Sequence, residues 1–517
     1  MLSGHAGPLP DANSASGFLL VLAIALPASG VALALTLGGR GAQRLALAMV
    51  PAGLAIAVAI AGDIWQSGTS LTYLVGGWHP PLGIALRADG LSAVMLLTTA
   101  VVIGAVCLYA RGSFGLPAGA HERRAPLVFW TMLMGVWSGL NAVWLAGDLF
   151  SLYVALELLT FSAVPLVSLD GSAETLAAAL RYLLFALIGS VLYLLGTALL
   201  YGGYGTLDLL LLSHVIRPEP TAFIAASLMT AGLLAKTALF PLHLWLPPAH
   251  AGAPAAGSAL LSALVVKGSF ILIVRLWFEA MPGLLRPAMT QMLGLLGASA
   301  IIFGSVLALR QARLKLMIAY STIAQIGYLF FLFPLAAAPP AMSSMFADDW
   351  NGFAWTGGIM QLVAHATAKA AMFMAAGVIA ETLGHDRIAE FAGLGRALPV
   401  TMLAFGLGGM SLMGLPPSGG FVAKAMLLVA SVAEGQWWWA VVILVGGLLA
   451  AGYMFRVFAP SLVAADLAVS PRVEVSPGRQ AVVLALAICA MLLGLVPLRP
   501  SQLLEVGRFA PVTALTR

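Results

Sequence analysis

Runs of apolar residues, separated by short polar connections, repeat along almost the whole of this 517-residue chain. About 20 apolar residues in a helix cross the hydrocarbon core of a bilayer, so each run is a candidate transmembrane helix. The pattern predicts an all-α polytopic membrane protein with about 14 transmembrane helices. The expected spans are 17–37, 43–62, 90–110, 126–146, 148–168, 178–201, 221–241, 255–278, 287–309, 314–336, 354–380, 400–430, 436–458 and 480–497.

The connections between these runs also carry information. Residues 63–89 are too polar to span, and Gly76-Gly77 and Pro80-Pro81 favour an extracytoplasmic hairpin there. Residues 207–215 are long enough for a short helix at the membrane surface. The first 15 residues lack a basic region followed by an apolar one, so we expect no cleaved signal peptide.

Two of the expected helices contain prolines beside a lysine. Helix 7 ends in a stretch from Lys236 to Pro248, and helix 12 contains Pro416-Pro417 seven residues before Lys424. Proline removes a helix hydrogen bond, and freed carbonyls are tolerated at membrane depth only inside protein or along a cavity. We therefore predict that helices 7 and 12 are discontinuous; the alternative is that the prolines only kink them.

Similar breaks five helices apart are what two inverted five-helix repeats would produce. The predicted organisation is N-terminal helices 1–3 with the hairpin, a first repeat of helices 4–8, a second repeat of helices 9–13, and a C-terminal loop, helix and tail. The corresponding ranges are 1–125, 126–280, 281–460 and 461–517.

Composition supports the membrane assignment and excludes other classes. Hydrophobic residues make up 61% of the chain and charged residues 9%. The net charge of +5 comes from arginines spread over many loops, so it indicates membrane topology and no nucleic-acid partner. Loops on one side hold twice as many basic residues as loops on the other, which places both termini outside the cytoplasm of a bacterial inner membrane. Cys107 and Cys489 lie far apart, and we find no metal motif, nucleotide fingerprint or other cofactor site.

Lysine is used differently from arginine in this chain. The arginines fall in loops, tails or helix ends, whereas Lys236, Lys267, Lys369 and Lys424 interrupt apolar runs and Lys315 stands at the mouth of one. An ammonium in hydrocarbon costs about 2.5 kcal/mol or more, so each buried lysine needs a partner, a hydrated cavity or a function. Burial also lowers the pKa of a lysine toward neutrality, where it can exchange protons.

Glu157 is the one acidic residue that the pattern places in the middle of a span. Beside Lys236 each group would keep the other charged, and opening the pair would turn the lysine into a proton donor. The alternative is a static ion pair that fixes helix register. His365 and Lys369 lie four residues apart on one helix face, which favours a relay. His243 and His250 flank the break in helix 7 as gating or capping groups.

These motifs resemble the antiporter-like, proton-conducting membrane subunits of respiratory complex I, group 4 membrane hydrogenases and Mrp-type antiporters. The resemblance is carried over residues 70–460 by five stretches: Gly147 to Phe150 followed by Glu157, Lys236 to Pro254, Lys315 to Gly327, His365 to Phe373, and Gly414 to Lys424. Gly77-Trp78 and Pro81 to Ile84 are similar to the D-type branch of the Mrp antiporter subunits.

The resemblance implies roles for matched positions. Glu157 and Lys236 look like a coupling pair, Lys267 and His365 like a central relay, and Lys424 like the terminal lysine of the second half-channel. Lys315 and Lys369 match basic positions that occur in some branches. Pro248 and Arg313 depart from many relatives; both stand at helix mouths, so the details of proton access are in doubt rather than the relay.

The leading hypothesis is therefore a proton-translocating subunit of a multisubunit complex. Its expected partners are other membrane subunits, the lipid bilayer and protons, with sodium left open. Two alternatives are the membrane subunit of an energy-coupled inorganic-carbon uptake system and a stand-alone secondary solute carrier. The sequence shows no redox chemistry of its own, so whether the chain belongs to a proton-translocating oxidoreductase stays open.

The basic-residue bias makes a prediction about orientation. Reporter fusions at Gly4 and Thr516 should both behave as extracytoplasmic, because the loops richer in arginine face the cytoplasm. Alkaline phosphatase and fluorescent-protein fusions measure this directly. A cytoplasmic C-terminus would contradict the 14-span arrangement.

Overall fold

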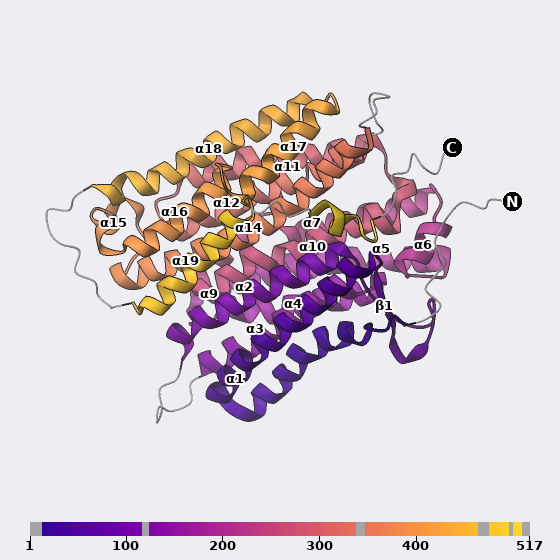
Figure 1. Ribbon diagram of the computed structural model, residues 1–517, viewed down its shortest axis with the longest axis horizontal. Helices are drawn as coiled ribbons and strands as arrows, with labels where there is room; N and C mark the ends of the chain where they lie inside the picture. The colour runs from indigo at the N-terminus through magenta and orange to yellow at the C-terminus, as the bar shows by residue number, and fades with distance from the viewer. Residues whose placement is uncertain (1–12, 116–123, 338–346, 464–474, 496–499, 509–517) are drawn as a thin grey trace.

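The computed structural model describes residues 13–115, 124–337, 347–463, 475–495 and 500–508. The described residues are mostly helical, and the helices lie side by side with their axes roughly aligned (Figure 1). The N-terminal helices form one edge of the molecule and α18 lies at the opposite edge. The two chain ends and the last two residues of the predicted span 480–497 lie outside the described residues.

The first part of the chain is a long helix, a hairpin and two further helices. The long helix reverses direction at Gly38, where φ is 71°, and Gly30 in its first half packs against Met49 in its second. The predicted spans 17–37 and 43–62 are these two halves. The elements are α1 (Phe18–Ser67), β1 (Leu71–Leu74), η1 (Val75–Gly77), β2 (Ala85–Ala88), α2 (Gly90–Phe114) and α3 (Arg124–Leu145).

The middle of the chain contains the first predicted break. The predicted surface helix at 207–215 is present as α6. The elements are α4 (Leu149–Val167), α5 (Ala173–Tyr204), α6 (Leu209–Val215), α7 (Pro220–Thr237), α8 (Leu246–Gly252), α9 (Ala255–Leu260), the π-helical turn η2 (Leu261–Val265), α10 (Val266–Arg275), the π-helical turn η3 (Leu276–Ala280) and η4 (Pro282–Leu284).

The second half contains the other break, between α16 and α17. The predicted span 314–336 is also divided, because α12 ends at Leu329 and α13 begins at Leu332. The elements are α11 (Pro287–Arg310), α12 (Leu314–Leu329), α13 (Leu332–Ala336), α14 (Ala347–Leu383), η5 (Ile388–Glu390), α15 (Leu394–Ala397), α16 (Pro399–Met413), α17 (Gly419–Ala433), α18 (Trp437–Leu462), α19 (Pro477–Leu492) and α20 (Pro500–Glu505).

Ten helical segments within the described ranges are long and apolar enough to cross a membrane, and α16, α17 and α19 are shorter apolar helices. The chain is therefore a polytopic helical membrane protein. The number of 14 crossings and the two inverted repeats stay predictions. The runs Ala255–Ala280 and Gly352–Leu383 are the most deeply buried, which places the lysines of α10 and α14 at the centre of the molecule.

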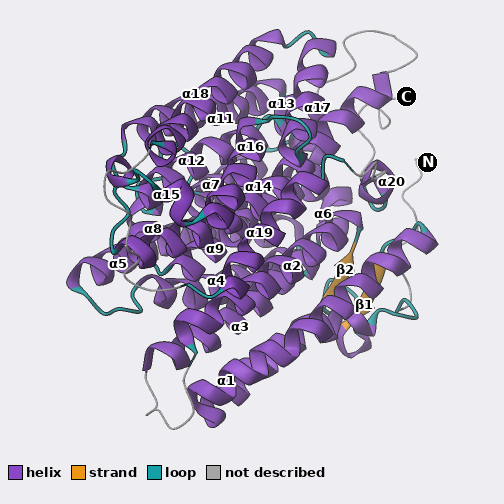
Figure 2. Cartoon of the chain, turned by 60° about the vertical axis from the view of Figure 1, so that its left-hand side comes forward, coloured by secondary structure: helices purple, strands orange, loops and turns teal. Residues whose placement is uncertain are grey.

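One end of the molecule is closed by a small β structure. β1 and β2 pair antiparallel, from Leu71 opposite Ala88 to Leu74 opposite Ala85, as the predicted hairpin requires (Figure 2). Leu86 of β2 also bridges to Ala146, and a separate bridge joins Asp148, before α4, to Asp208, before α6. The backbone N–H of Ser14 donates to Thr72, and Gly90 donates to Val506, so the first and last described segments meet at this same end.

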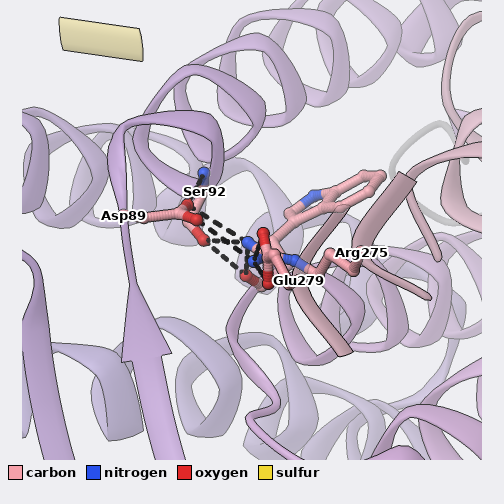
Figure 3. A network of polar contacts seen from close by, with 5 residues as sticks. Asp89, Ser92, Arg275 and Glu279 are labelled. Carbon is pink, nitrogen blue, oxygen red and sulfur yellow. Dashed lines mark hydrogen bonds and ion pairs between the residues drawn. The ribbon is translucent and has the colours of Figure 1, made fainter. Parts of the chain in front are cut away.

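An arginine that was expected to be a loop charge is buried here, which corrects that assignment. Arg275 ends α10 and contacts two carboxylates, Asp89 at 3.1 Å and Glu279 at 2.7 Å, and also the Ser92 hydroxyl at 2.8 Å (Figure 3). The π-helical turn after Arg275 extends the helix to Ala280 and so keeps the guanidinium inside. Burial raises the pKa of Asp89, but the guanidinium outweighs that effect and holds the pKa below its usual value.

This cluster joins α2 to the buried α10 helix and predicts a stability effect. Arg275→Met should destabilise the protein by about 3–5 kcal/mol, because it leaves two buried carboxylates without their cation. The control is Arg313→Met, whose half-exposed side chain pairs with Asp386 at 2.9 Å and should cost about 1 kcal/mol or less. Thermal unfolding of the purified protein in detergent compares the two. Equal melting temperatures would show that the cluster does not stabilise the fold.

Candidate functional site

Close packing of α5 on α7 builds the first part of the site. A side chain on Gly189 would collide with the carbonyl oxygen of Gly232, and one on Gly232 with that of Gly189, so the two backbones touch. Small residues at such crossings are typical of membrane helices. The crossing brings Ser190 of α5 and Lys236 of α7 together against α4.

The predicted pair forms at this crossing. Lys236 Nζ lies 2.9 Å from Glu157 Oε1, and it also donates to the Thr160 hydroxyl at 3.1 Å. The Ser190 hydroxyl donates to the same Glu157 oxygen. The lysine side chain is 6% exposed and the glutamate 15%, so the pair is largely sealed and the carboxylate is its outer member.

The break in helix 7 begins directly after Lys236. α7 ends at Thr237, and Ala238 adopts a left-handed conformation with φ 57° that turns the chain out of the helix. The freed Ala235 carbonyl accepts from Trp245 Nε1 at 2.9 Å. The Thr237 hydroxyl donates to Ser269 at 2.9 Å, which links the end of α7 to α10.

Lys267 is the second residue of α10, is fully buried, and has no carboxylate partner in the described ranges. Its Nζ donates to the Ser262 carbonyl at 2.6 Å, in the π-helical turn that precedes α10. Such turns interrupt the regular helix bonding and leave a carbonyl available to a side chain. The Ser262 hydroxyl lies 2.9 Å from that of Thr322, so the site continues from α10 to α12.

Lys369 and Lys424 complete the series in the second half. Lys369 on α14 donates to the Ile318 carbonyl at 2.8 Å and to the Ser321 hydroxyl, both on α12. Lys424 on α17 reaches back across the break to the Leu412 carbonyl, 2.5 Å away, in the last turn of α16. Its ammonium also lies 4.2 Å from the centre of the Tyr328 ring.

The histidines fall into two groups. His250 and His365 are fully buried, and neither ring nitrogen of either residue has a hydrogen-bond partner among the described residues. His250 stacks on Phe373 of α14, with the ring centres 4.6 Å apart. His243 lies in the α7–α8 break against the rings of Phe240 and Phe303, away from the lysines of the second half.

Lys315 lies at the start of α12, as its position at the mouth of a predicted span suggested. Its Nζ donates to the Ala253 carbonyl at 2.6 Å, in the connection between α8 and α9. The carboxylate of Asp386 accepts from the Lys315 backbone and pairs with Arg313, so a loop after α14 fixes the start of α12.

The four buried lysines come from α7, α10, α14 and α17, and hydroxyl contacts join α7 to α10, η2 to α12 and α14 to α12. Each ammonium is held by one or two oxygen atoms, and only Lys236 has a carboxylate among the residues that the structure describes. In the same described ranges, no group of three or more His, Cys, Asp and Glu could hold a metal ion. Lys267, Lys369 and Lys424 have neutral acceptors, an arrangement that suits proton transfer.

Two sets of partners were not predicted from the sequence. Gln361 and Gln325 form a buried amide pair beside Lys424, and the spacing of two glutamines on different helices gives no signal for it. Arg479, expected in a loop, pairs with both oxygens of Glu381 at 2.6 and 2.9 Å and so fastens α19 to α14. Only the tertiary structure brings these side chains together.

Comparison with known proteins shows the family of the chain. The family described as "NADH:quinone oxidoreductase/Mrp antiporter, TM" matches residues 146–450. The N subunit of the NADH-quinone oxidoreductase of Desulforudis audaxviator is 33% identical over 448 residues, which cover 85% of this chain and 80% of that protein. The D subunit of the Na(+)/H(+) antiporter of Bacillus subtilis is 30% identical over 411 residues, 78% of this chain and 79% of that protein.

The fold is also found in a solved structure. A chain of the Mrp complex from Dietzia sp. DQ12-45-1b superposes with a TM-score of 0.82 over 94% of this chain and 96% of that chain. The two are 24% identical, so this likeness concerns the fold.

Proposed function

The chain belongs to the NADH:quinone oxidoreductase/Mrp antiporter membrane family, and from that premise we propose that it moves protons along the buried side chains from Glu157 to Lys424. Glu157 tunes the proton affinity of Lys236. Lys267 and His365 then relay the proton, and Lys424 releases it. Lys369 extends the relay, and Lys315, His243 and His250 serve its approaches. The observation that carries this proposal is that Lys267, Lys369 and Lys424 sit on neutral oxygens, which stabilise an ammonium without locking it as a carboxylate would.

We further propose that the chain works as one subunit of a multisubunit membrane complex. Its relatives are named as subunits of an NADH-quinone oxidoreductase and of a Na(+)/H(+) antiporter, and its fold occurs in an Mrp complex. These findings favour the leading hypothesis over the stand-alone carrier and the inorganic-carbon uptake system. Other membrane subunits would supply the driving reaction, and an Mrp-type, complex I-like or hydrogenase-like assembly all fit.

The two-repeat organisation is part of the proposal. Residues 126–280 and 281–460 each contain one broken helix with a buried lysine, Lys236 before the first break and Lys424 after the second. A broken helix in each half, five helices apart, is what two inverted-topology repeats would produce. We propose in addition that both termini face away from the cytoplasm.

The Glu157–Lys236 pair provides the main test. Lys236→Ala and Lys424→Ala should each abolish proton uptake by inverted vesicles that contain the assembled complex, because each removes a protonation site. Lys236→Arg should fail as well, since a guanidinium keeps its proton at physiological pH. Glu157→Gln should reduce uptake less than either lysine loss, because the Thr160 hydroxyl still holds the ammonium.

Native gels on the same membranes control for assembly of each variant. A static ion pair would tolerate Lys236→Arg, which keeps the charge opposite Glu157. A Lys236→Arg variant that assembles and takes up protons at the wild-type rate would therefore contradict the relay.

The break between α16 and α17 gives a second test. Pro417 has no N–H, so it cannot donate to the carbonyls at the end of α16, one of which holds Lys424. Pro417→Ala adds a donor that competes for those carbonyls and should lower proton uptake while leaving assembly intact. Uptake and native-gel assembly measure the two effects, and unchanged uptake would show that the prolines only kink the helix.

A further inference from the structure

We propose that Gln325 is a positioning residue for Lys424, which keeps the Leu412 carbonyl hydrogen-bonded whenever the lysine leaves it. Gln361 in turn holds Gln325 in place. This inference rests on the proposed role of Lys424 as a proton carrier. It assigns Gln325 of α12 and Gln361 of α14 to the control of proton release from Lys424.

The Leu412 carbonyl depends on side-chain donors because of its place at the end of a helix. The last four carbonyls of a helix lack partners within the helix, and Leu412 is the residue before the end of α16. The N–H groups of Gly414 and Leu415 bond back to Met410 and Ser411. Two side chains donate to the Leu412 oxygen: Lys424 Nζ at 2.5 Å and Gln325 Nε2 at 3.0 Å.

Gln325 is itself oriented by a second amide. Gln361 Nε2 donates to Gln325 Oε1 at 2.9 Å, and both side chains are buried. This contact fixes which end of the Gln325 amide points at Leu412. Gln361 lies four residues before His365 on α14 and therefore on the same helix face. The amide pair thus starts on the face of α14 that carries His365 and ends at the acceptor of Lys424.

Sharing one carbonyl has two physical consequences. First, a buried carbonyl that loses its donor retains its full desolvation penalty, so a lysine that was its sole donor would be slow to leave. Secondly, a hydrogen bond to the ammonium favours the charged form, and a carbonyl that already accepts from Gln325 favours it less. Gln325 therefore both speeds the departure of Lys424 and eases loss of its proton.

Few other titratable groups surround Lys424. Tyr328 from α12 lies beneath the ammonium, Tyr453 from α18 is buried near Tyr328, and His365 from α14 is within electrostatic range. No carboxylate pairs with Lys424 in the described part of the chain. A change in the pH dependence of the last step therefore reports mainly on the Leu412 acceptor.

The chain contains a matched control for the amide pair. Gln291 Nε2 donates to Gln436 Oε1 at 2.7 Å, and Gln436 Nε2 donates to the Pro334 carbonyl at 2.9 Å. This pair likewise has two amides and one main-chain acceptor, although Gln436 Oε1 also accepts from Trp439 Nε1 at 3.0 Å, and no lysine shares the Pro334 oxygen in the described structure. Loss of this pair removes similar packing and hydrogen bonds without touching the proposed relay.

The experiment compares Gln325→Leu with Gln436→Leu in the assembled complex in inverted vesicles, measuring proton uptake between pH 6 and 9. Gln325→Leu should slow uptake about tenfold at pH 7, because Lys424 then holds its proton more tightly. The pH of half-maximal uptake should rise by about one unit, since a tenfold change in proton affinity corresponds to one pH unit. Gln361→Leu should shift the profile in the same direction by less. Gln436→Leu should lower thermal stability and leave the pH profile in place.

A Gln325→Leu profile that superposes on the wild type, or that falls equally at every pH as a structural loss would, overturns the inference. If Gln325→Leu does not assemble, Gln361→Leu decides, because it leaves the bond from Gln325 to Leu412 possible but unoriented. Lys424→Ala distinguishes the positioning role of Gln325 from the proposed function of the chain. Normal uptake by that variant removes the proposed function itself, whereas abolished uptake with an unshifted Gln325→Leu profile removes only the positioning role.

Discussion

A charged ammonium in a membrane interior must contact oxygen atoms, and this requirement organises the protein. Lys236 meets it with a carboxylate and a hydroxyl, whereas Lys267, Lys369 and Lys424 meet it with main-chain carbonyls. Lys369 uses the second lone pair of a carbonyl inside α12, whereas Lys267 and Lys424 have acceptors at helix irregularities. The fold supplies them near Lys267 by a π-helical turn and near Lys424 by ending one helix and starting another.

The helix irregularities therefore belong to the site. A break costs backbone hydrogen bonds, and in a membrane each unsatisfied group is expensive. Here the freed groups find side-chain partners: Trp245 for the Ala235 carbonyl, and Gln325 with Lys424 for the Leu412 carbonyl. At the second break, the carbonyl that Gln325 satisfies is also the acceptor of Lys424, so the structure and the proposed transport share this contact.

Two buried arginines form ion pairs away from the buried lysines. Arg275 with Asp89 and Glu279, and Arg479 with Glu381, join helices that are distant in sequence near opposite ends of α2, whose Ser113 also contacts Arg479. Arginine cannot lose its proton at physiological pH, which suits it to fixed clamps. Lysine, which can, is reserved for the centre. The arginine pairs thus hold α10 and α14 near their ends, outside the stretches that contain Lys267 and Lys369.

The sequence by itself determined the class of protein, the position of most helices, both broken helices, and the pairing of Glu157 with Lys236. Hydrophobic runs and proline positions are local, and one acid among buried lysines leaves few choices of partner. It did not determine the acceptors of Lys267, Lys369 and Lys424, because main-chain carbonyls carry no sequence signal. Arg275 looked like a loop charge, because only the π-helical turn and the approach of Asp89 make it buried. The Gln325–Gln361 pair depends on how α12 and α14 pack, and helix packing is decided by the tertiary structure.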